Sequence, residues 1–289
     1  MTDQYKLAGI VCARPQQFAW CLGAGASAAA GLPTAWDIIW DLKRRYYRRE
    51  ENQDISRQDM QLDAVRARVQ SCMLSKGFPE EGNPGEYTTC FEKAFGDDKE
   101  KQRQYLAAIL SEKKVTLSIG NRILGALLAS GGTRSVFTTN FDTIVERAVA
   151  EVSGQSLAAF HLEGAASANK AISNEEYPVY CKLHGDFRYD SIKNLQADLA
   201  SQNEDLSKAL VNAANRFGFI VAGYSGRDDS VMQLFRSALS TQNPFPHGLF
   251  WTGMKVSRVL PAVTGLIEDA KRAGVDAASL KSKRSTRSC

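Results

Sequence analysis

The 289-residue sequence contains no apolar run long enough to span a membrane, and residues 1–22 lack the apolar core and cleavage-site pattern of a secretory signal. Its six cysteines are scattered, and none belongs to a C-x-x-C pair. This spacing does not suggest zinc, and Cys21 and Cys181 lie inside expected buried strands. We therefore expect a protein of the reducing cytoplasm, with no metal site and no membrane association.

A large excess of charge is also missing. The net charge is +4, with 24% charged and 44% hydrophobic residues, which is ordinary for a globular protein. This balance does not indicate direct nucleic-acid binding. One expected helix, residues 36–49, carries a basic face made of Lys43, Arg44, Arg45, Arg48 and Arg49. Such a face is more often a solvated helix surface than a phosphate site, and we expect the former here.

Apolar runs bounded by turn residues are typical of buried strands. They occur at residues 18–22, 135–139, 179–183, 217–222 and 248–251, with a weaker one at 157–161. Helical patterns occur at residues 142–152, 205–215, 230–240 and 261–274. Alternation of strands and helices predicts an α/β fold, with a Rossmann-like doubly wound and mostly parallel sheet.

Residues 52–115 contain no convincing strand, and their helical spacing predicts a helical insertion packed against the sheet domain. Before them, Thr34 and Asp37 have the spacing of a capping box at the start of the basic helix. We expect one domain over residues 1–278. The remaining residues, 279–289, are polar and basic, and we expect them to form a disordered tail.

A glycine turn follows the first expected strand, with the sequence Gly23-Ala24-Gly25-Ala26-Ser27. Between a strand and a helix, such a turn lets the backbone approach a phosphate and directs helix N–H groups at it. Hydride-transferring enzymes with this turn place an acidic residue on a second strand about 20 residues later. In this sequence that region is the basic helix, so a dehydrogenase is not expected.

Polar or small residues also follow three other expected strands: Asn140 and Asp142, then His184, then Gly223 and Ser225. In doubly wound sheets, ligands bind beyond the carboxyl ends of the strands. Four strands would thus deliver candidate ligand-binding groups to one rim of the sheet.

Each of these residues also has a structural explanation. Asn140 could satisfy backbone groups at its turn, and Ser225 could be a helix cap. Asp142 could be an N-cap, although Thr143 and Glu146 have capping-box spacing one residue later. His184 precedes a glycine at a strand end, where we expect it to face a cleft. The other two histidines, at positions 161 and 247, have no such setting.

Taken in order, these motifs resemble those of the sirtuin-like NAD-binding family. The matching stretches are Gly23-Ala-Gly-Ala-Ser27 with Gly31-Leu-Pro33, then Thr138-Thr-Asn-Phe-Asp142, His184-Gly185 and Gly223-Tyr-Ser225, and the resemblance extends over about residues 15–275.

Protein-deacylating sirtuins carry a zinc ribbon after the histidine and an Asp-Phe-Arg run after the proline. This sequence has no such cysteines, and it has Thr34-Ala-Trp-Asp37 after Pro33. It instead resembles the sirtuin-like effectors of bacterial antiphage systems, which hydrolyse NAD+ to ADP-ribose and nicotinamide.

The resemblance implies NAD+ as substrate and a role for each matching residue. Gly23, Ala24, Gly25 and Ser27 would hold the diphosphate and nearby ribose, and Gly223 and Ser225 would face the adenosine half. Asn140 would position the nicotinamide ribose or the attacking water, Asp142 would recognise the carboxamide, and His184 would be the general base. Asn140 and His184 would be the catalytic residues, with no metal required.

Two other functions stay open at this point. The protein could be an NAD-dependent protein deacylase, which would form O-acetyl-ADP-ribose from an acetylated peptide. It could also be a non-catalytic nucleotide-binding or assembly module. The resemblance further implies a homo-oligomer, or a partner protein such as a HerA-type ATPase or a short Argonaute.

Overall fold

Six strands form the sheet of the computed structural model, which describes residues 4–111, 115–161, 165–185, 204–253 and 259–281. The strands are β1 (Phe18–Leu22), β2 (Ser135–Thr138), β3 (Val179–Lys182), β4 (Gly218–Ala222), β5 (Leu249–Gly253) and β6 (Ala277–Lys281). Their order is β3-β2-β1-β4-β5-β6, and every pair of neighbours is parallel. This is the order of a doubly wound sheet, in which the direction of winding reverses beside β1. The predicted fold class is confirmed.

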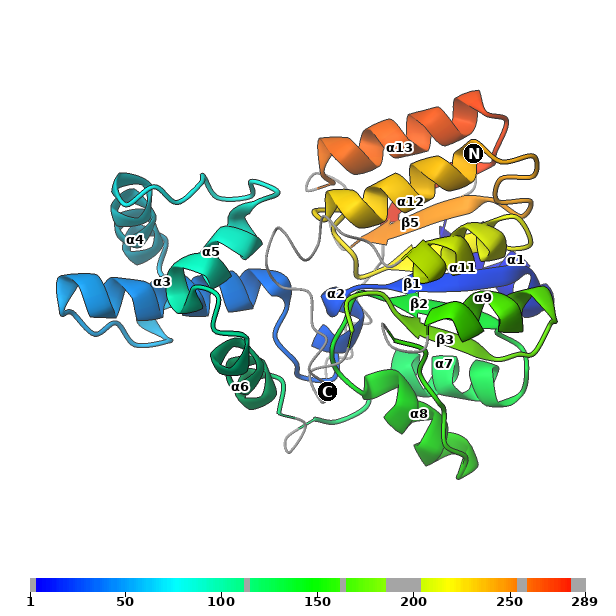
Figure 1. The fold of residues 1–289 in the computed structure, drawn as a ribbon, viewed down its shortest axis with the longest axis horizontal. Coiled ribbons are helices and arrows are strands. Elements are labelled where there is room, and N and C mark those ends of the chain that lie inside the picture. The colour runs from blue at the N-terminus through cyan, green and yellow to red at the C-terminus, as the bar shows by residue number, and fades with distance from the viewer. Residues whose placement is uncertain (1–3, 112–114, 162–164, 186–203, 254–258, 282–289) are drawn as a thin grey trace.

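Helices cover both faces of this sheet (Figure 1). Alternate residues of β1 point to opposite faces, so Ala19 and Cys21 join one apolar cluster while Phe18 and Leu22 join others. The first cluster packs under α9 (Ala165–Ser173), α11 (Glu204–Ala214), α12 (Asp229–Leu239) and α13 (Pro261–Arg272). The opposite face packs under α1 (Gln4–Ala13), α7 (Ile119–Ala129) and α8 (Ile144–Ser153). Burial on both faces explains why the central strands are continuous apolar runs.

A helical module lies beside the sheet domain and has a core of its own (Figure 1). It consists of α3 (Ala35–Glu51), η2 (Asp59–Gln61), α4 (Asp63–Ser75), α5 (Glu86–Phe95) and α6 (Lys99–Ile109). The predicted insertion is therefore helical, but it begins earlier than residue 52. The reason is that the apolar face of α3, with Ile39 and Leu42, packs into the core of the module.

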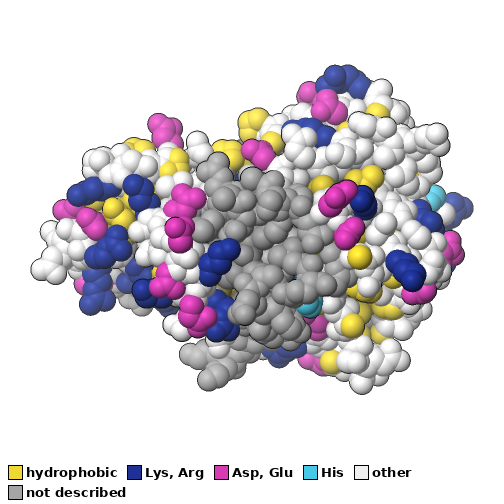
Figure 2. Space-filling view, in the orientation of Figure 1, with side chains coloured by type: hydrophobic (Ala, Val, Ile, Leu, Met, Phe, Trp, Pro, Cys, Tyr) yellow, Lys and Arg dark blue, Asp and Glu magenta, His cyan; other side chains and the backbone are white. Residues whose placement is uncertain are grey.

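Helix α3 begins as predicted. The Thr34 hydroxyl accepts a hydrogen bond from the Asp37 N–H, and the Asp37 carboxylate accepts one from the Thr34 N–H. The prediction of a solvated basic face was wrong for Lys43, which is fully buried. It also missed the acidic partners of the arginines. Basic and acidic side chains are interspersed over the module in Figure 2.

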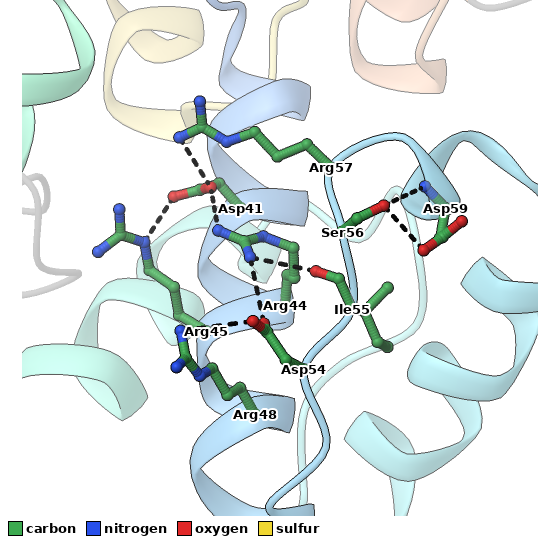
Figure 3. A network of polar contacts seen from close by, with 9 residues as sticks. All are labelled: Asp41, Arg44, Arg45, Arg48, Asp54, Ile55, Ser56, Arg57 and Asp59. Carbon is green, nitrogen blue, oxygen red and sulfur yellow. Dashed lines mark hydrogen bonds and ion pairs between the residues drawn. The ribbon is translucent and has the colours of Figure 1, made fainter.

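Three arginines of α3, Arg44, Arg45 and Arg48, pair with Asp41 and Asp54 (Figure 3). Arg45 Nε lies 2.7 Å from Asp41 Oδ2, and Arg44 lies 3.2 Å from Asp41 Oδ1 and 3.8 Å from Asp54. Arg48 lies 3.7 Å from Asp54. Because two carboxylates neutralise much of the cluster, this face does not form a free phosphate-binding patch.

The sheet extends further than the sequence indicated. Strand β6 pairs with β5 and ends at Lys281, so the expected domain end at residue 278 falls inside a strand. Alanine and lysine are depleted in strands and make up three of residues 277–281, which explains why this stretch gave no strand signal. Residues 282–289 of the expected tail lie outside the described residues. The weak strand candidate at 157–161 contributes only an isolated bridge between Phe160 and Cys181.

Helix α2 (Ala24–Ala28) has five residues, begins directly after Gly23 and contains the rest of the glycine turn. Helices α1 and α9 had no counterpart in the sequence-based prediction. Among the described residues, we find no helix with both the length and the apolar character needed to cross a membrane.

Candidate functional site

A cavity of about 540 Å³ lies where the carboxyl ends of β1, β2, β3 and β4 face the helical module. Most of the predicted site residues line it: Ala24, Gly25, Asn140, Asp142, His184, Gly223 and Ser225. Gly23 and Ser27 do not line it, and they lie behind it as supports for other residues. The structure thus brings together residues that are up to about 200 positions apart in the chain.

The opposite wall of the cavity is largely apolar and comes from the helical module. It includes Trp36, Ile38, Tyr87 and Leu110. Phe141, which follows Asn140, packs into the core of the module and also lines the cavity. Its ring centre is 6.3 Å from that of His184. Sequence reasoning missed this wall because spacing shows which helix face is apolar but not what that face packs against.

The glycine turn is built by close packing of two loops. A side-chain carbon at Gly23 would lie 2.5 Å from Tyr224 Cα, and one at Gly25 would lie 2.8 Å from Gly223 Cα. The Gly25 N–H donates to the Gly223 carbonyl at 2.9 Å, and the Gly23 N–H donates to Ala222 at 3.0 Å. Glycine is therefore needed at both positions for contact between loops. The Gly25 N–H, expected to face a phosphate, is already used inside the protein.

Asn140 is held in place by hydrogen bonds to the glycine turn. Its Nδ2 donates to the Gly23 carbonyl at 3.1 Å and to Ser27 Oγ at 3.2 Å, and its backbone N–H donates to Thr138 Oγ1 at 3.0 Å. Because both amide contacts are internal, the side-chain Oδ1 is the atom left to meet a ligand. Ser27 is buried, so in this structure its hydroxyl orients the amide of Asn140.

Asp142 is a buried carboxyl at the start of α8. Its Oδ1 accepts the Ile144 N–H at 3.1 Å, while the Thr143 side chain makes no capping hydrogen bond. The capping box expected from Thr143 is thus replaced by capping from Asp142. Burial raises the pKa of Asp142 to about 6, although hydrogen bonds from Ser27 and Ile144 and the charge of Lys182 oppose this rise.

Lys182 holds the loop that contains Asp142. Its side chain is fully buried, and Nζ donates to the Asp142 carbonyl at 2.8 Å while lying 2.8 Å from Glu146 Oε1. A buried ammonium group needs such partners because burial alone strongly disfavours its charge. This lysine therefore fixes the backbone that carries Asn140 and Asp142.

His184 is paired with a carboxylate that the sequence-based prediction did not include. Its Nε2 lies 2.6 Å from Asp228 Oδ2. The other oxygen of Asp228 accepts the Ser230 N–H at 2.9 Å and the Ser230 hydroxyl at 2.7 Å. Asp228 is thus the N-cap of α12, and only the fold shows that its second oxygen meets His184.

The charge of Asp228 is stabilised by these partners. Burial acts to raise its pKa, but the hydrogen bond and charge of His184, together with the hydrogen bonds from Ser230, outweigh burial and lower it. A carboxylate on Nε2 leaves Nδ1 as the other ring nitrogen, free to accept a proton. The site thus brings the amide oxygen of Asn140, the buried carboxyl of Asp142 and the imidazole of His184, which is paired with Asp228, to one cavity.

Neither of the remaining histidines belongs to this site, since neither lines the cavity. No group of three or more His, Cys, Asp or Glu side chains in the described parts of the chain could hold a metal ion.

Comparison with known families gives a match within the chain. Residues 134–260 match the family model of the SIR2-like domain. This range contains Asn140, His184 and Gly223 but not the glycine turn. A search of curated proteins gave no match. A solved structure from work on the structural basis for the mechanism and regulation of Sir2 enzymes aligns over 94% of this chain and 98% of its own, with 14% identity and a TM-score of 0.43. The part of the chain that carries Asn140 and His184 is thus similar to a SIR2-like domain.

Proposed function

We propose that the protein is an NAD+ glycohydrolase, which cleaves the bond between nicotinamide and ribose with water to give ADP-ribose and nicotinamide. The observation that carries the proposal is the shared cavity of Asn140 and His184, with Asp228 behind the imidazole. The match to a SIR2-like domain supports the use of NAD+ more generally.

The reaction needs few groups from the protein, because nicotinamide is already a good leaving group. As the bond between ribose C1′ and the ring nitrogen breaks, its electron pair goes to nicotinamide and positive charge develops on the ribose. A water oxygen then bonds to C1′ and loses a proton. Asn140 Oδ1 would orient that water or a ribose hydroxyl, and His184 Nδ1 would accept the proton. The Asp228 carboxylate would stabilise the resulting imidazolium.

The other cavity residues would hold the substrate. Ala24, Gly25, Gly223 and Ser225 line the part built from the glycine turn and the loop after β4, which suits the phosphates and the adenosine half. Asp142, whose carboxyl is both buried and hydrogen-bonded, would recognise the nicotinamide carboxamide. The apolar wall with Trp36 and Phe141 would limit access of bulk water to the reacting carbon.

A cellular role as the effector of an antiphage system, which depletes NAD+ in the infected cell, is part of this proposal. It rests on the resemblance of the motif residues to those of the antiphage effectors, and on the lack of the zinc-ribbon cysteines that deacylating sirtuins carry. The same resemblance motivates assembly into a homo-oligomer or with a HerA-type ATPase or short Argonaute. A test is phage challenge of cells that express the protein, alone and with each candidate partner, with cellular NAD+ measured over time. The proposed role fails if NAD+ stays constant in every combination.

The test of the activity itself is product analysis after incubation with NAD+, at several protein concentrations and with and without an acetylated peptide. Hydrolysis predicts nicotinamide and ADP-ribose in equal amounts, with no dependence on the peptide. O-acetyl-ADP-ribose that appears only with the peptide would indicate a deacylase instead. Binding of NAD+ without any product would indicate a nucleotide-binding module.

A further inference from the structure

Arg227 is a charged residue of the cavity that the proposed reaction does not use. It lies in the connection between β4 and α12, lines the cavity, and reaches toward the helical module. Its Nη1 is 3.7 Å from Glu86 Oε2 at the start of α5, and its side chain is 20% exposed. Nη1 itself is buried and makes no hydrogen bond within the described structure.

The nearest carboxylate, Glu86, is already occupied. Glu86 Oε1 lies 2.5 Å from Lys43 Nζ, and Glu86 Oε2 accepts the Gly82 N–H at 2.9 Å. Lys43 and Glu86 are both buried, so their charges compensate each other directly. At 3.7 Å, Arg227 is beyond hydrogen-bond distance of Glu86 and adds one positive charge to a pair that is already neutral.

The acidic residues of the cavity do not supply a partner either. Asp228 is engaged by His184 and Ser230, and Asp142 by Ile144 and Ser27. Asp229 is exposed at the start of α12 and forms no ion pair with Arg227 in the described structure. A buried guanidinium N–H without an acceptor is unfavourable, and an anionic group in the cavity would remove that cost.

We propose that Arg227 binds a phosphate group of the ligand in this cavity. A guanidinium matches phosphate oxygens with two parallel hydrogen bonds, and it keeps its charge at every physiological pH. The glycine turn does not offer its Gly25 N–H for this contact, because that group donates to the Gly223 carbonyl at 2.9 Å. Glu86 lies 3.7 Å from Arg227, so the helical module borders the proposed phosphate site. This inference rests on the proposed function only in taking the phosphate to be that of a dinucleotide.

The experiment measures binding, not turnover, by calorimetry with three probes: ADP-ribose, inorganic pyrophosphate and adenosine. The variants are Arg227→Gln and, as a matched control on the helix that follows, Arg236→Gln, which does not line the cavity. Arg227→Lys keeps the positive charge but lacks the guanidinium group that can form two parallel hydrogen bonds to phosphate. We expect Arg227→Gln to bind ADP-ribose and pyrophosphate about ten- to hundred-fold more weakly, and adenosine as the wild type does. Arg227→Lys is expected to lie between, and Arg236→Gln to match the wild type.

Equal affinity of wild type and Arg227→Gln for ADP-ribose and pyrophosphate would overturn the proposal. So would a parallel loss of adenosine binding with a lowered melting temperature, which would show that Arg227 supports the fold. A wild type that binds neither phosphate probe also overturns it. A wild type that binds ADP-ribose through Arg227 but forms no product from NAD+ would refute the proposed hydrolysis and leave the phosphate site standing.

Discussion

At the scale of single residues, the pair of His184 and Asp228 determines how the imidazole is presented to the cavity. Asp228→Asn keeps the helix cap, because asparagine accepts the Ser230 N–H as aspartate does. It removes the negative charge beside Nε2 of the ring, which in the proposed reaction would stabilise the imidazolium. We expect NAD+ cleavage to fall by about 10²–10⁴ in kcat, with an unchanged melting temperature. Asp63→Asn, the same change at an exposed position, serves as the control. An Asp228→Asn enzyme with wild-type kcat would remove Asp228 from the mechanism.

Asp142 predicts a pH dependence of stability. An aspartate ionises near pH 4 in the unfolded chain, whereas burial raises the pKa of Asp142 to about 6 in the folded protein. Between these values the folded chain holds a proton that the unfolded chain has released. The contribution of this group to the free energy of unfolding therefore falls as pH rises through the window, and the loss is complete above pH 6.

Asp142→Asn cannot titrate, so it isolates this contribution. From pH 4.5 to pH 7, the free energy of unfolding of the wild type should decrease relative to that of Asp142→Asn by about 1–3 kcal/mol. Urea unfolding of both proteins across this range measures the difference, in which other titrating groups cancel. A constant difference, or one that changes in the opposite direction, would show that the carboxyl is ionised throughout.

At the scale of elements, the two loops at the switch point of the sheet depend on each other. Gly223 has φ +69°, and a side-chain carbon there would lie 2.2 Å from the Ala26 backbone nitrogen. We expect Gly223→Ala to lower the free energy of unfolding by about 3 kcal/mol or more, the sum of left-handed strain and overpacking. Gly82→Ala is the matched control, since Gly82 has φ +86° in open space. It should cost only about 1–2 kcal/mol. Equal losses in the two variants would mean that the loops are not packed this closely.

The elements also show what the sequence can predict. Buried parallel strands are continuous apolar runs, so β1 to β5 were evident, and polar residues at strand ends pointed to one rim. Strand β6 was not evident because it is rich in alanine and lysine, which are depleted in strands. The burial of Lys43 was not predictable because its partner Glu86 lies 43 positions away. Asp228 and Arg227 were visible only as loop residues, since their roles depend on contacts across the cavity.

At the scale of the whole molecule, the cavity is shared between two separately packed parts. The sheet domain supplies Asn140 and His184, and the helical module supplies the apolar wall and the Lys43–Glu86 pair beside Arg227. Phe141, which lies in the sheet domain between Asn140 and Asp142, packs into the module core. The position of the module is thus coupled to the loop that carries Asn140.

The most direct measurement of the central claim compares NAD+ cleavage by the wild type with cleavage by His184→Ala and Asn140→Ala. His247→Ala and Asn243→Ala, which lie outside the cavity, are the matched controls. The account predicts nicotinamide release by the wild type and both controls, and a loss of about 10²–10⁴ in each site variant, with each variant still folded. Nicotinamide release at the wild-type rate by His184→Ala or Asn140→Ala would contradict it.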